Sequence, residues 1–231
     1  MEVKTNRIEG AVWHKAIQKQ TTTIVGLGAT GSFVSLLLAR AGINHLRLVD
    51  FDYYEIHNLG SQLADYQDIG ENKARATANK LALFSSATTV SVYNDRIENK
   101  SGLLTPNYSN IVISALDSMS GRKYIFETMK SNNYRGQLLL DSRIGAEYLE
   151  VYCIPMNNQD YVDRYAETLF SDEQGNTGAC NYQQSSHSAC MAACEMVKLV
   201  TNWVTNKLME DDDIPFKITH DLRTNNYGVH Y

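Results

Sequence analysis

The sequence lacks the features that define several large classes of protein. Its four cysteines are too few for a disulfide framework in 231 residues, so we expect a reducing compartment, the cytoplasm. Lysine and arginine total 21 against 26 aspartates and glutamates, and a net charge of −5 argues against nucleic acid as a ligand. No apolar run reaches the roughly 18–20 residues that cross a membrane, and the polar first residues predict no signal segment.

What is present is the composition of a globular protein, with 43% hydrophobic and 20% charged residues. The length predicts a single domain over 1–231, divided into a core (1–155) and a C-terminal part (156–231). In the core, apolar runs typical of strands alternate with segments that have one apolar helical face. This alternation predicts an α/β fold: a Rossmann-like, doubly wound, mostly parallel sheet with helices on both faces. The expected strands are 21–28, 45–52, 89–95, 110–117, 137–145 and 147–155, and the expected helices are 32–41, 72–84 and 118–130.

The C-terminal part has a different texture. Residues 156–187 are polar and rich in Asn, Gln and Gly, with one expected helix at 161–169. A stretch with so little regular structure is usually a functional or crossover segment. We expect a long helix over about 188–208, with an apolar stripe for the core or a dimer interface. A last strand, 216–222, is expected at the edge of the sheet.

A glycine-rich turn carries the strongest local signal. Gly26-Leu-Gly28-Ala-Thr-Gly31 follows a strand directly and opens a helix, where backbone N–H groups can approach phosphates. Asp50 ends the next strand, 19 residues after Gly31, and its carboxylate can accept hydrogen bonds from both ribose hydroxyls. The pattern predicts that 1–155 binds a nucleotide, although a tight turn without a ligand is the alternative. It does not separate NAD from ATP.

Motifs downstream of the turn distinguish between NAD and ATP. Asp50 begins DFDYYEIHNLGSQ, in which Asn58 and Gln62 lie, and IGENK then ends at Lys73. Asp117 follows at the end of a later strand, in SALDS. Over roughly residues 5–205, this series resembles the ThiF/MoeB-type family, the bacterial relatives of ubiquitin-activating enzymes. The resemblance is to the short, stand-alone versions of bacteria and mobile elements.

The resemblance implies an ATP–magnesium site and an adenylyltransferase activity. In the family, D-x-D-x(5)-N-L-x-R-Q, G-x-x-K and a strand-end Asp build this site. The C-terminal carboxylate of a ubiquitin-like or sulfur-carrier protein, or of a peptide, would become an acyl-adenylate as pyrophosphate leaves. Asp117 is the implied Mg²⁺ ligand. The residues implied to bind ATP are Gly26, Gly28, Gly31, Asp50, Asp52, Asn58, Gln62 and Lys73.

The chemistry of the side chains supports this interpretation independently. Lys73 can place a point charge on phosphate oxygens, and Asp117 can hold magnesium. A substrate carboxylate is already ionised at neutral pH, so it needs no general base. Taken singly, however, a lysine on a helix is usually solvated, and Asp117-Ser118 could cap the next helix. Only the combination favours a catalytic site.

Two arginines and one serine bear on the activity. Asn6-Arg7 resembles the family's N-x-R-Q opening, whose arginine reaches into the neighbouring subunit's ATP site, so the resemblance implies a homodimer. Ser61 stands where the family has arginine, and a serine supplies neither charge nor a bidentate fork. Arg143 follows the buried run QLLLD and is our candidate for a replacement in the pocket. A surface ion pair between Asp141 and Arg143 is the alternative.

Two other functions remain open for that reason. The loss of the family arginine at position 61 is compatible with a non-catalytic relative that binds nucleotides or partners. An NAD(P)-dependent oxidoreductase would use the same glycine turn, but no segment for a substrate domain with a proton-transfer residue is evident.

Cysteine chemistry is the last question. Cys180 lies in the polar segment where family members with a catalytic cysteine carry it, so it could form a thioester, with a structural cysteine as the alternative. The two C-x-x-C pairs of the family's zinc site are missing. His187, Cys190 and Cys194 share one helical face downstream of Cys180, but metal-binding cysteines usually come in close pairs. We expect Cys190 and Cys194 to be small thiols buried among alanines.

Overall fold

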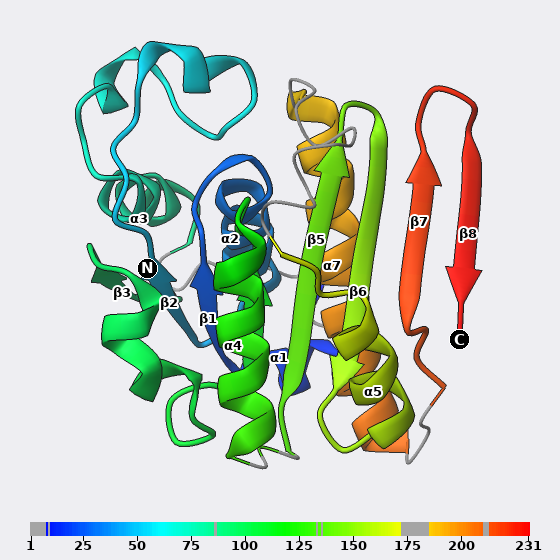
Figure 1. The fold of residues 1–231 in the computed structure, drawn as a ribbon. Coiled ribbons are helices and arrows are strands. Elements are labelled where there is room, and N and C mark those ends of the chain that lie inside the picture. Colours follow the sequence, from blue (N-terminus) through cyan, green and yellow to red (C-terminus); the bar gives the residue numbers. More distant parts are fainter. Residues whose placement is uncertain are drawn as a thin grey trace.

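The computed structural model describes residues 8, 10–85, 87–132, 134, 136–171, 185–209 and 213–231. These residues contain an eight-stranded sheet in the order β3-β2-β1-β4-β5-β6-β7-β8 (Figure 1). The first five strands of this order run parallel and the last three are antiparallel, which confirms the predicted α/β, mostly parallel sheet. The strands are β1 (Thr21–Val25), β2 (His45–Val49), β3 (Thr89–Tyr93), β4 (Ile111–Ser114), β5 (Leu138–Gly145), β6 (Tyr148–Pro155), β7 (Lys217–Asp221) and β8 (Asn226–His230).

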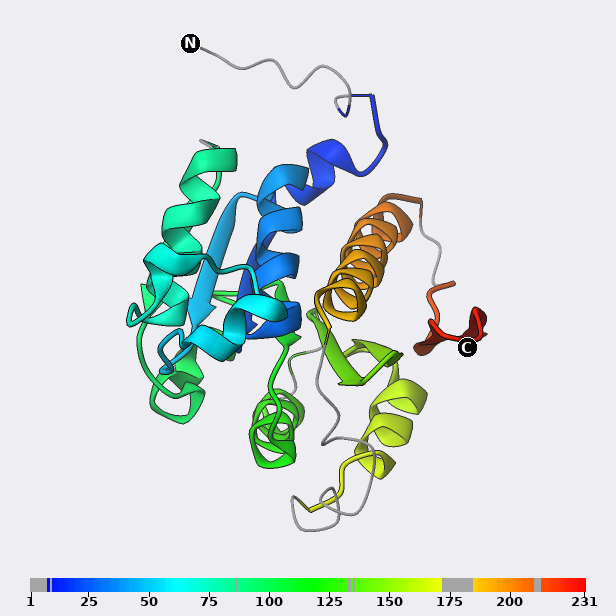
Figure 2. The ribbon, with the colours of Figure 1, turned by 90° about the horizontal axis from the view of Figure 1, so that it is seen from above.

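Helices cover both faces of the sheet, as the alternation predicted (Figure 2). On one face lie α1 (His14–Ile17), α2 (Ala29–Ala41), α3 (Lys73–Phe84) and α7 (Ser186–Met209). On the other lie the 3-10 segment η3 (Ile97–Leu104), α4 (Met119–Ser131) and α5 (Gln159–Glu167). Two short 3-10 segments, η1 (Ile56–Gly60) and η2 (Tyr66–Asp68), lie between β2 and α3.

The central strands are rich in apolar residues because each is buried on both faces. In β1, Ile24 belongs to the apolar cluster under α2 and α7, and its neighbour Val25 belongs to the cluster under α4 and α5. Successive side chains on a strand point to opposite faces, so a continuous apolar run serves two helical layers.

Within the described part of the chain, no helix combines the length and hydropathy needed to cross a membrane.

The expected position of the last strand is wrong. The strand predicted at 216–222 corresponds to β7, which pairs with β6 on one side and with β8 on the other. The edge strand is β8, because the chain reverses after Asp221 and pairs Asn226 back onto it. Asn225 makes this reversal with φ +55°, a left-handed conformation that asparagine tolerates better than most residues.

Candidate functional site

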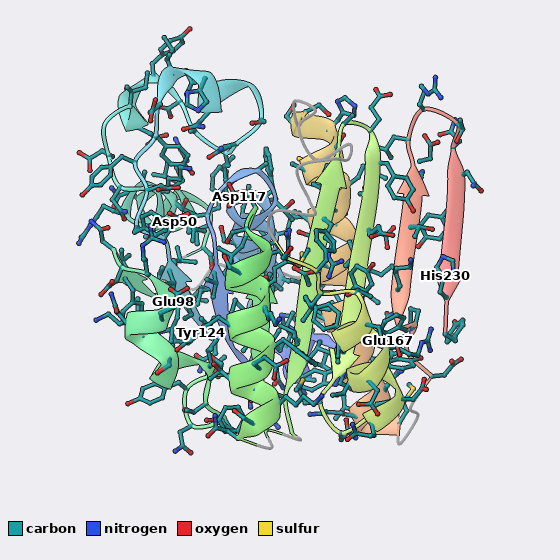
Figure 3. All side chains as sticks on the ribbon, in the orientation of Figure 1. Asp50, Glu98, Asp117, Tyr124, Glu167 and His230 are labelled. Atoms are coloured by element: carbon teal, nitrogen blue, oxygen red, sulfur yellow. The ribbon has the colours of Figure 1, made fainter. Side chains whose placement is uncertain are left out.

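The predicted site lies at the carboxyl edge of the parallel strands. The chain runs on from β1 to its neighbour β2 but reaches the other neighbour, β4, only after β3, so the winding reverses at β1. Ligands of open α/β sheets bind at such a switch point. Figure 3 shows Asp50, which follows β2, and Asp117, which follows β4, at this same edge.

Each glycine of the turn has its own reason to be there. Gly26 has φ +88°, and a Cβ added to it would lie 2.6 Å from the carbonyl oxygen of Ala115. A Cβ on Gly31 would lie 1.8 Å from the carbonyl oxygen of Gly26. Gly28 differs, since its added Cβ would meet nothing closer than the Gln62 side-chain nitrogen at 4.0 Å. Packing therefore demands glycine at two of the positions, whereas Gly28 borders open space.

The start of α2 faces that open space. Gly28 is the N-cap residue of the helix, and no side chain caps its first N–H groups. Uncapped N–H groups and the partial positive charge of a helix N-terminus favour a phosphate. The turn can therefore take the phosphate that the sequence predicted.

Asp50 connects the glycine turn to the segment after β2. Its Oδ2 accepts a hydrogen bond from the backbone N–H of Leu27 at 2.6 Å, and its Oδ1 accepts one from Asp52 N–H at 2.8 Å. Each carboxylate oxygen can accept a second hydrogen bond. The predicted contact with ribose hydroxyls is thus compatible with a structural role in holding the turn. Burial raises the pKa of Asp50, against the opposing effects of these two N–H groups and of Lys73.

This shift predicts a pH dependence. Because the pKa of Asp50 is raised, this carboxylate takes up its proton at a higher pH than an ordinary aspartate, whose pKa is about 3.9. We expect nucleotide affinity, measured by calorimetric titration from neutral pH downwards, to fall with a midpoint above that value. Asp50→Asn should bind more weakly at neutral pH and lack this transition. The nucleotide's own titration is common to both proteins, so equal pH profiles would contradict the prediction.

The effect of the same shift on stability has the opposite direction. A raised pKa means that the folded protein binds the Asp50 proton more tightly than the unfolded chain does. This contribution to the free energy of unfolding is present below the unfolded pKa and is lost as pH rises through the folded pKa. Protonation of Asp50 does not destabilise the fold. Loss of nucleotide that follows this protonation would therefore be a change in the binding site and not unfolding caused by Asp50.

Lys73 is buried, which contradicts the alternative of a solvated helix residue. It begins α3, and its Nζ lies 3.6 Å from Oδ2 of the half-exposed Asp52. Asn72 caps the helix by accepting from Arg75 N–H, and its side-chain amide donates to the carbonyl oxygens of Asp50 and Asp52. The start of α3 is therefore locked to the strand end that carries Asp50.

Asn58 and Gln62 lie on η1 and directly after it. Asn58 is buried, and its side-chain oxygen accepts from Glu55 N–H. The backbone N–H of Gln62 donates to the Asn58 carbonyl oxygen, which brings the Gln62 side chain to the open space at Gly28. The Gln62 Oε1 is buried without a hydrogen-bond partner. An unpaired buried polar atom costs about 1–3 kcal/mol, and because this oxygen is an acceptor, a ligand group that donates a hydrogen bond would remove that cost.

Asp117 is exposed at the same edge and is not the cap of α4. The N-cap residue is Ser118, which makes no side-chain capping hydrogen bond. Magnesium binds through one or two carboxylates together with substrate phosphates and keeps several waters. A single exposed carboxylate beside a turn with uncapped N–H groups fits that requirement.

Arg143 forms a buried ion pair, not the surface pair that was its alternative. Its Nε donates to Oδ2 of the fully buried Asp141 at 3.0 Å. Its other two nitrogens donate to the carbonyl and hydroxyl oxygens of Thr168, and its guanidinium lies over the Tyr152 ring. At least three of its five N–H groups are thus committed to the protein, so Arg143 holds β5 to the end of α5.

Sequence reasoning missed Arg122, the second arginine on Asp141. Its Nε donates to Asp141 Oδ1 at 2.9 Å and its Nη2 to the Ser142 carbonyl oxygen at 2.9 Å. It also reaches the Asp117 carbonyl oxygen at 3.4 Å. A signal was available, because Arg122 follows the strand-end Asp117 by five residues, within the first turns of α4.

Arg7 and Cys180 lie outside the described residues. Among the residues that are described, no three His, Cys, Asp or Glu side chains form a group that could hold a metal ion. The expected burial of two helix cysteines is wrong: Cys190 is half-buried and Cys194 exposed. On α7, Ala189, Ala192 and Ala193 face the core, which turns these two thiols away from it.

Comparisons with known proteins agree with this geometry. The profile of the ThiF family matches residues 3–227. The tRNA threonylcarbamoyladenosine dehydratase of Haemophilus influenzae is 33% identical over 112 residues, covering 47% of this chain and 42% of that protein. The adenylyltransferase and sulfurtransferase MOCS3 of Caenorhabditis briggsae is 30% identical over 118 residues, covering 50% and 29%. The chain spans less than half the length of these curated relatives.

Solved structures share the fold. E. coli MccB, in a structure with ATP, superposes with a TM-score of 0.72 at 18% identity, covering 95% of this chain and 65% of MccB. PaaA superposes with a TM-score of 0.71 at 18% identity, covering 95% and 75%.

Proposed function

This chain belongs to the ThiF family, and we propose that it is an ATP-dependent adenylyltransferase. The observation that carries the proposal is the buried Lys73, which lies beside Asp52 at the same edge as the glycine turn. A dinucleotide site needs the turn and the ribose-binding acid, whereas a departing pyrophosphate also needs a fixed cation. MccB, of the same fold, has been solved with ATP.

The proposed reaction uses positioning and charge. A substrate carboxylate oxygen attacks the α-phosphorus of ATP, the bond from that phosphorus to the bridging oxygen breaks, and pyrophosphate leaves with the electron pair. Asp50 holds the ribose, the N–H groups at the start of α2 and the amide of Gln62 hold phosphate oxygens, and Lys73 neutralises charge on the leaving group. Magnesium, held by Asp117, would screen the phosphate charge. No general base is needed, since the carboxylate is already ionised.

The proposed substrate is the C-terminal carboxylate of a small ubiquitin-like or sulfur-carrier protein, or of a peptide. MccB has been solved with MccA, and the relative from Bombyx mori, 28% identical over 123 residues, is a ubiquitin-like modifier-activating enzyme. A homodimer, in which Arg7 completes the neighbouring subunit's site, is part of the proposal. So is a cytoplasmic location, where ATP is available and thiols stay reduced; fractionation of the protein with a membrane or secreted pool would contradict it.

A non-catalytic relative is the second candidate, favoured by Ser61. This serine is the C-cap residue directly after η1, next to the Gln62 that borders the nucleotide space. Without the family's arginine, the protein would bind ATP and not convert it. ATP–pyrophosphate exchange in the presence of a carboxylate substrate separates the two candidates, since only an adenylyltransferase returns labelled pyrophosphate to ATP.

Calorimetric titration tests the proposed site. We expect the protein to bind ATP in the presence of magnesium and to show no binding of NAD. Asp117→Ala should lose the magnesium dependence, because it removes the carboxylate that holds the ion. Binding of NAD alone would contradict the proposal and favour an oxidoreductase. ATP binding that is the same with and without magnesium would remove the role given to Asp117.

A further inference from the structure

The turn that presents Asp117 is packed tightly from two sides. On one side is the glycine turn, since a Cβ on Gly26 would meet Ala115 O at 2.6 Å and a Cβ on Gly31 would meet Ala115 Cβ at 3.3 Å. On the other side is the first turn of α4, where a Cβ on Gly121 would lie 2.6 Å from Leu116 Cδ1. The residues before Asp117 are therefore in close contact with the glycine turn on one side and with the start of α4 on the other.

Arg122 connects this turn to the interior of the sheet. It is buried and spans three acceptors: the Asp117 carbonyl oxygen, the Asp141 carboxylate and the Ser142 carbonyl oxygen. The Asp141 side chain has no accessible surface, so neither solvent nor a ligand can contact it. Its second oxygen accepts from Arg143, so both of its oxygens are occupied by guanidinium groups.

Resting on the proposed function, we propose that Arg122 is a positioning residue for the magnesium site. It holds the backbone of the exposed Asp117 to the rigid β5 strand through the buried Asp141, so that the carboxylate is presented to the ion in one place. A guanidinium fork suits this task because it has several donors in a fixed plane. A lysine keeps the charge on Asp141 but cannot reach three acceptors in the same geometry. Groups that orient a metal ligand typically contribute a factor of about 10–100 in metal affinity.

The test compares magnesium binding with nucleotide binding that needs no magnesium. In Arg122→Lys, we expect the magnesium concentration that half-saturates ATP binding to rise about tenfold. AMP binding without metal, which reports the glycine turn and Asp50, should stay unchanged. Arg40→Lys, at the far end of α2, is the matched control and should change neither quantity. Thermal melting establishes that each variant is folded.

A second variant disturbs the same turn without touching the charges. Gly121→Ala adds a Cβ that must displace Leu116 and Ser118, so it should raise the magnesium requirement in the same way. This variant carries the test if Arg122→Lys does not fold. If both variants leave the magnesium requirement unchanged, or weaken AMP and magnesium binding equally, the positioning role is overturned.

Asp117→Asn separates this inference from the proposed function. If it leaves the magnesium dependence of the wild-type protein intact, Asp117 is not the ligand and both the proposed metal site and the inference fail. If it abolishes that dependence while the two variants of the turn do not alter it, only the role of Arg122 fails.

Discussion

Replacing Lys73 with alanine is expected to weaken ATP binding by about 10–100-fold, the loss that follows when a charged hydrogen-bond partner worth about 1.5–3 kcal/mol is removed. Binding of AMP should change little, because AMP lacks the phosphates that become pyrophosphate. The structure makes this lysine effective in two ways. It is buried, so solvent screens its charge weakly, and its helix is locked to the Asp50 segment through Asn72. Calorimetric titration with each nucleotide measures the difference.

The stability of this variant should remain close to that of the wild-type protein. The partner of Lys73 in the described ion pair is Asp52, whose side chain is 52% exposed and can be solvated when the lysine is removed. Lys19→Ala, an exposed lysine outside the site, is the matched control and should bind both nucleotides normally. Equal losses for ATP and AMP would mean that Lys73 supports the pocket as a whole and does not act on the leaving phosphates.

Lys73→Ala also tests the proposed dimer. If Arg7 acts in the neighbouring subunit's site, mixing Arg7→Ala with Lys73→Ala subunits should produce some dimers with one intact site. Activity of the mixture, measured by pyrophosphate exchange with a carboxylate substrate, should exceed that of either variant alone. Mixed dimers no better than the separate variants would rule out a contribution in trans.

Gly31→Ala is expected to have the largest effect on stability, a loss of about 3 kcal/mol or more in the free energy of unfolding. The added Cβ would lie 1.8 Å from the Gly26 carbonyl oxygen, which is a backbone atom held by the end of β1. Unlike the end of a flexible side chain, this atom cannot move without displacing the strand. Urea-induced unfolding measures the loss.

Gly28→Ala is the matched control on the same turn. Its Cβ would meet no atom closer than 4.0 Å, so we expect stability to fall by no more than about 1 kcal/mol. Nucleotide binding should nevertheless be lost, because the methyl group would occupy the space where a phosphate approaches the helix. If Gly28→Ala binds ATP normally, the phosphate does not lie in front of this residue. If Gly31→Ala is as stable as Gly28→Ala, the inferred clash between a Cβ at position 31 and the Gly26 carbonyl oxygen is wrong.

Much of the site could be predicted because its parts are local. The spacing of Gly26, Gly28 and Gly31 between a strand and a helix already predicts a tight turn, in which positions 26 and 31 admit only glycine. Asp50 was predictable because it ends the next strand, and parallel strands end at the same edge. Lys73 and Asp117 needed the family resemblance, since neither residue is unusual on its own helix or strand end.

The cysteines of α7 show what a periodic pattern cannot predict. A helical repeat of 3.6 residues places Cys190 and Cys194 on one face, but the sequence does not say which face meets the sheet. The structure turns the alanine face inwards, with Ala189, Ala192 and Ala193 buried, and leaves Cys194 exposed. The same limit explains the misplaced edge strand, because the return of β8 onto β7 depends on one left-handed residue, Asn225.

By itself, the sequence determined the alternation of strands and helices in residues 21–155, the glycine turn and the residues that follow each parallel strand. These depend on the periodicity of side chains and on backbone preferences within a few residues. Only the tertiary structure decided that Asp141 is shared by Arg122 and Arg143, and that Arg122 reaches the turn of Asp117. The arginines come from α4 and β5, and their common carboxylate is enclosed only when α4 packs on the sheet. Contacts of this kind arise from packing between elements, which no local pattern encodes.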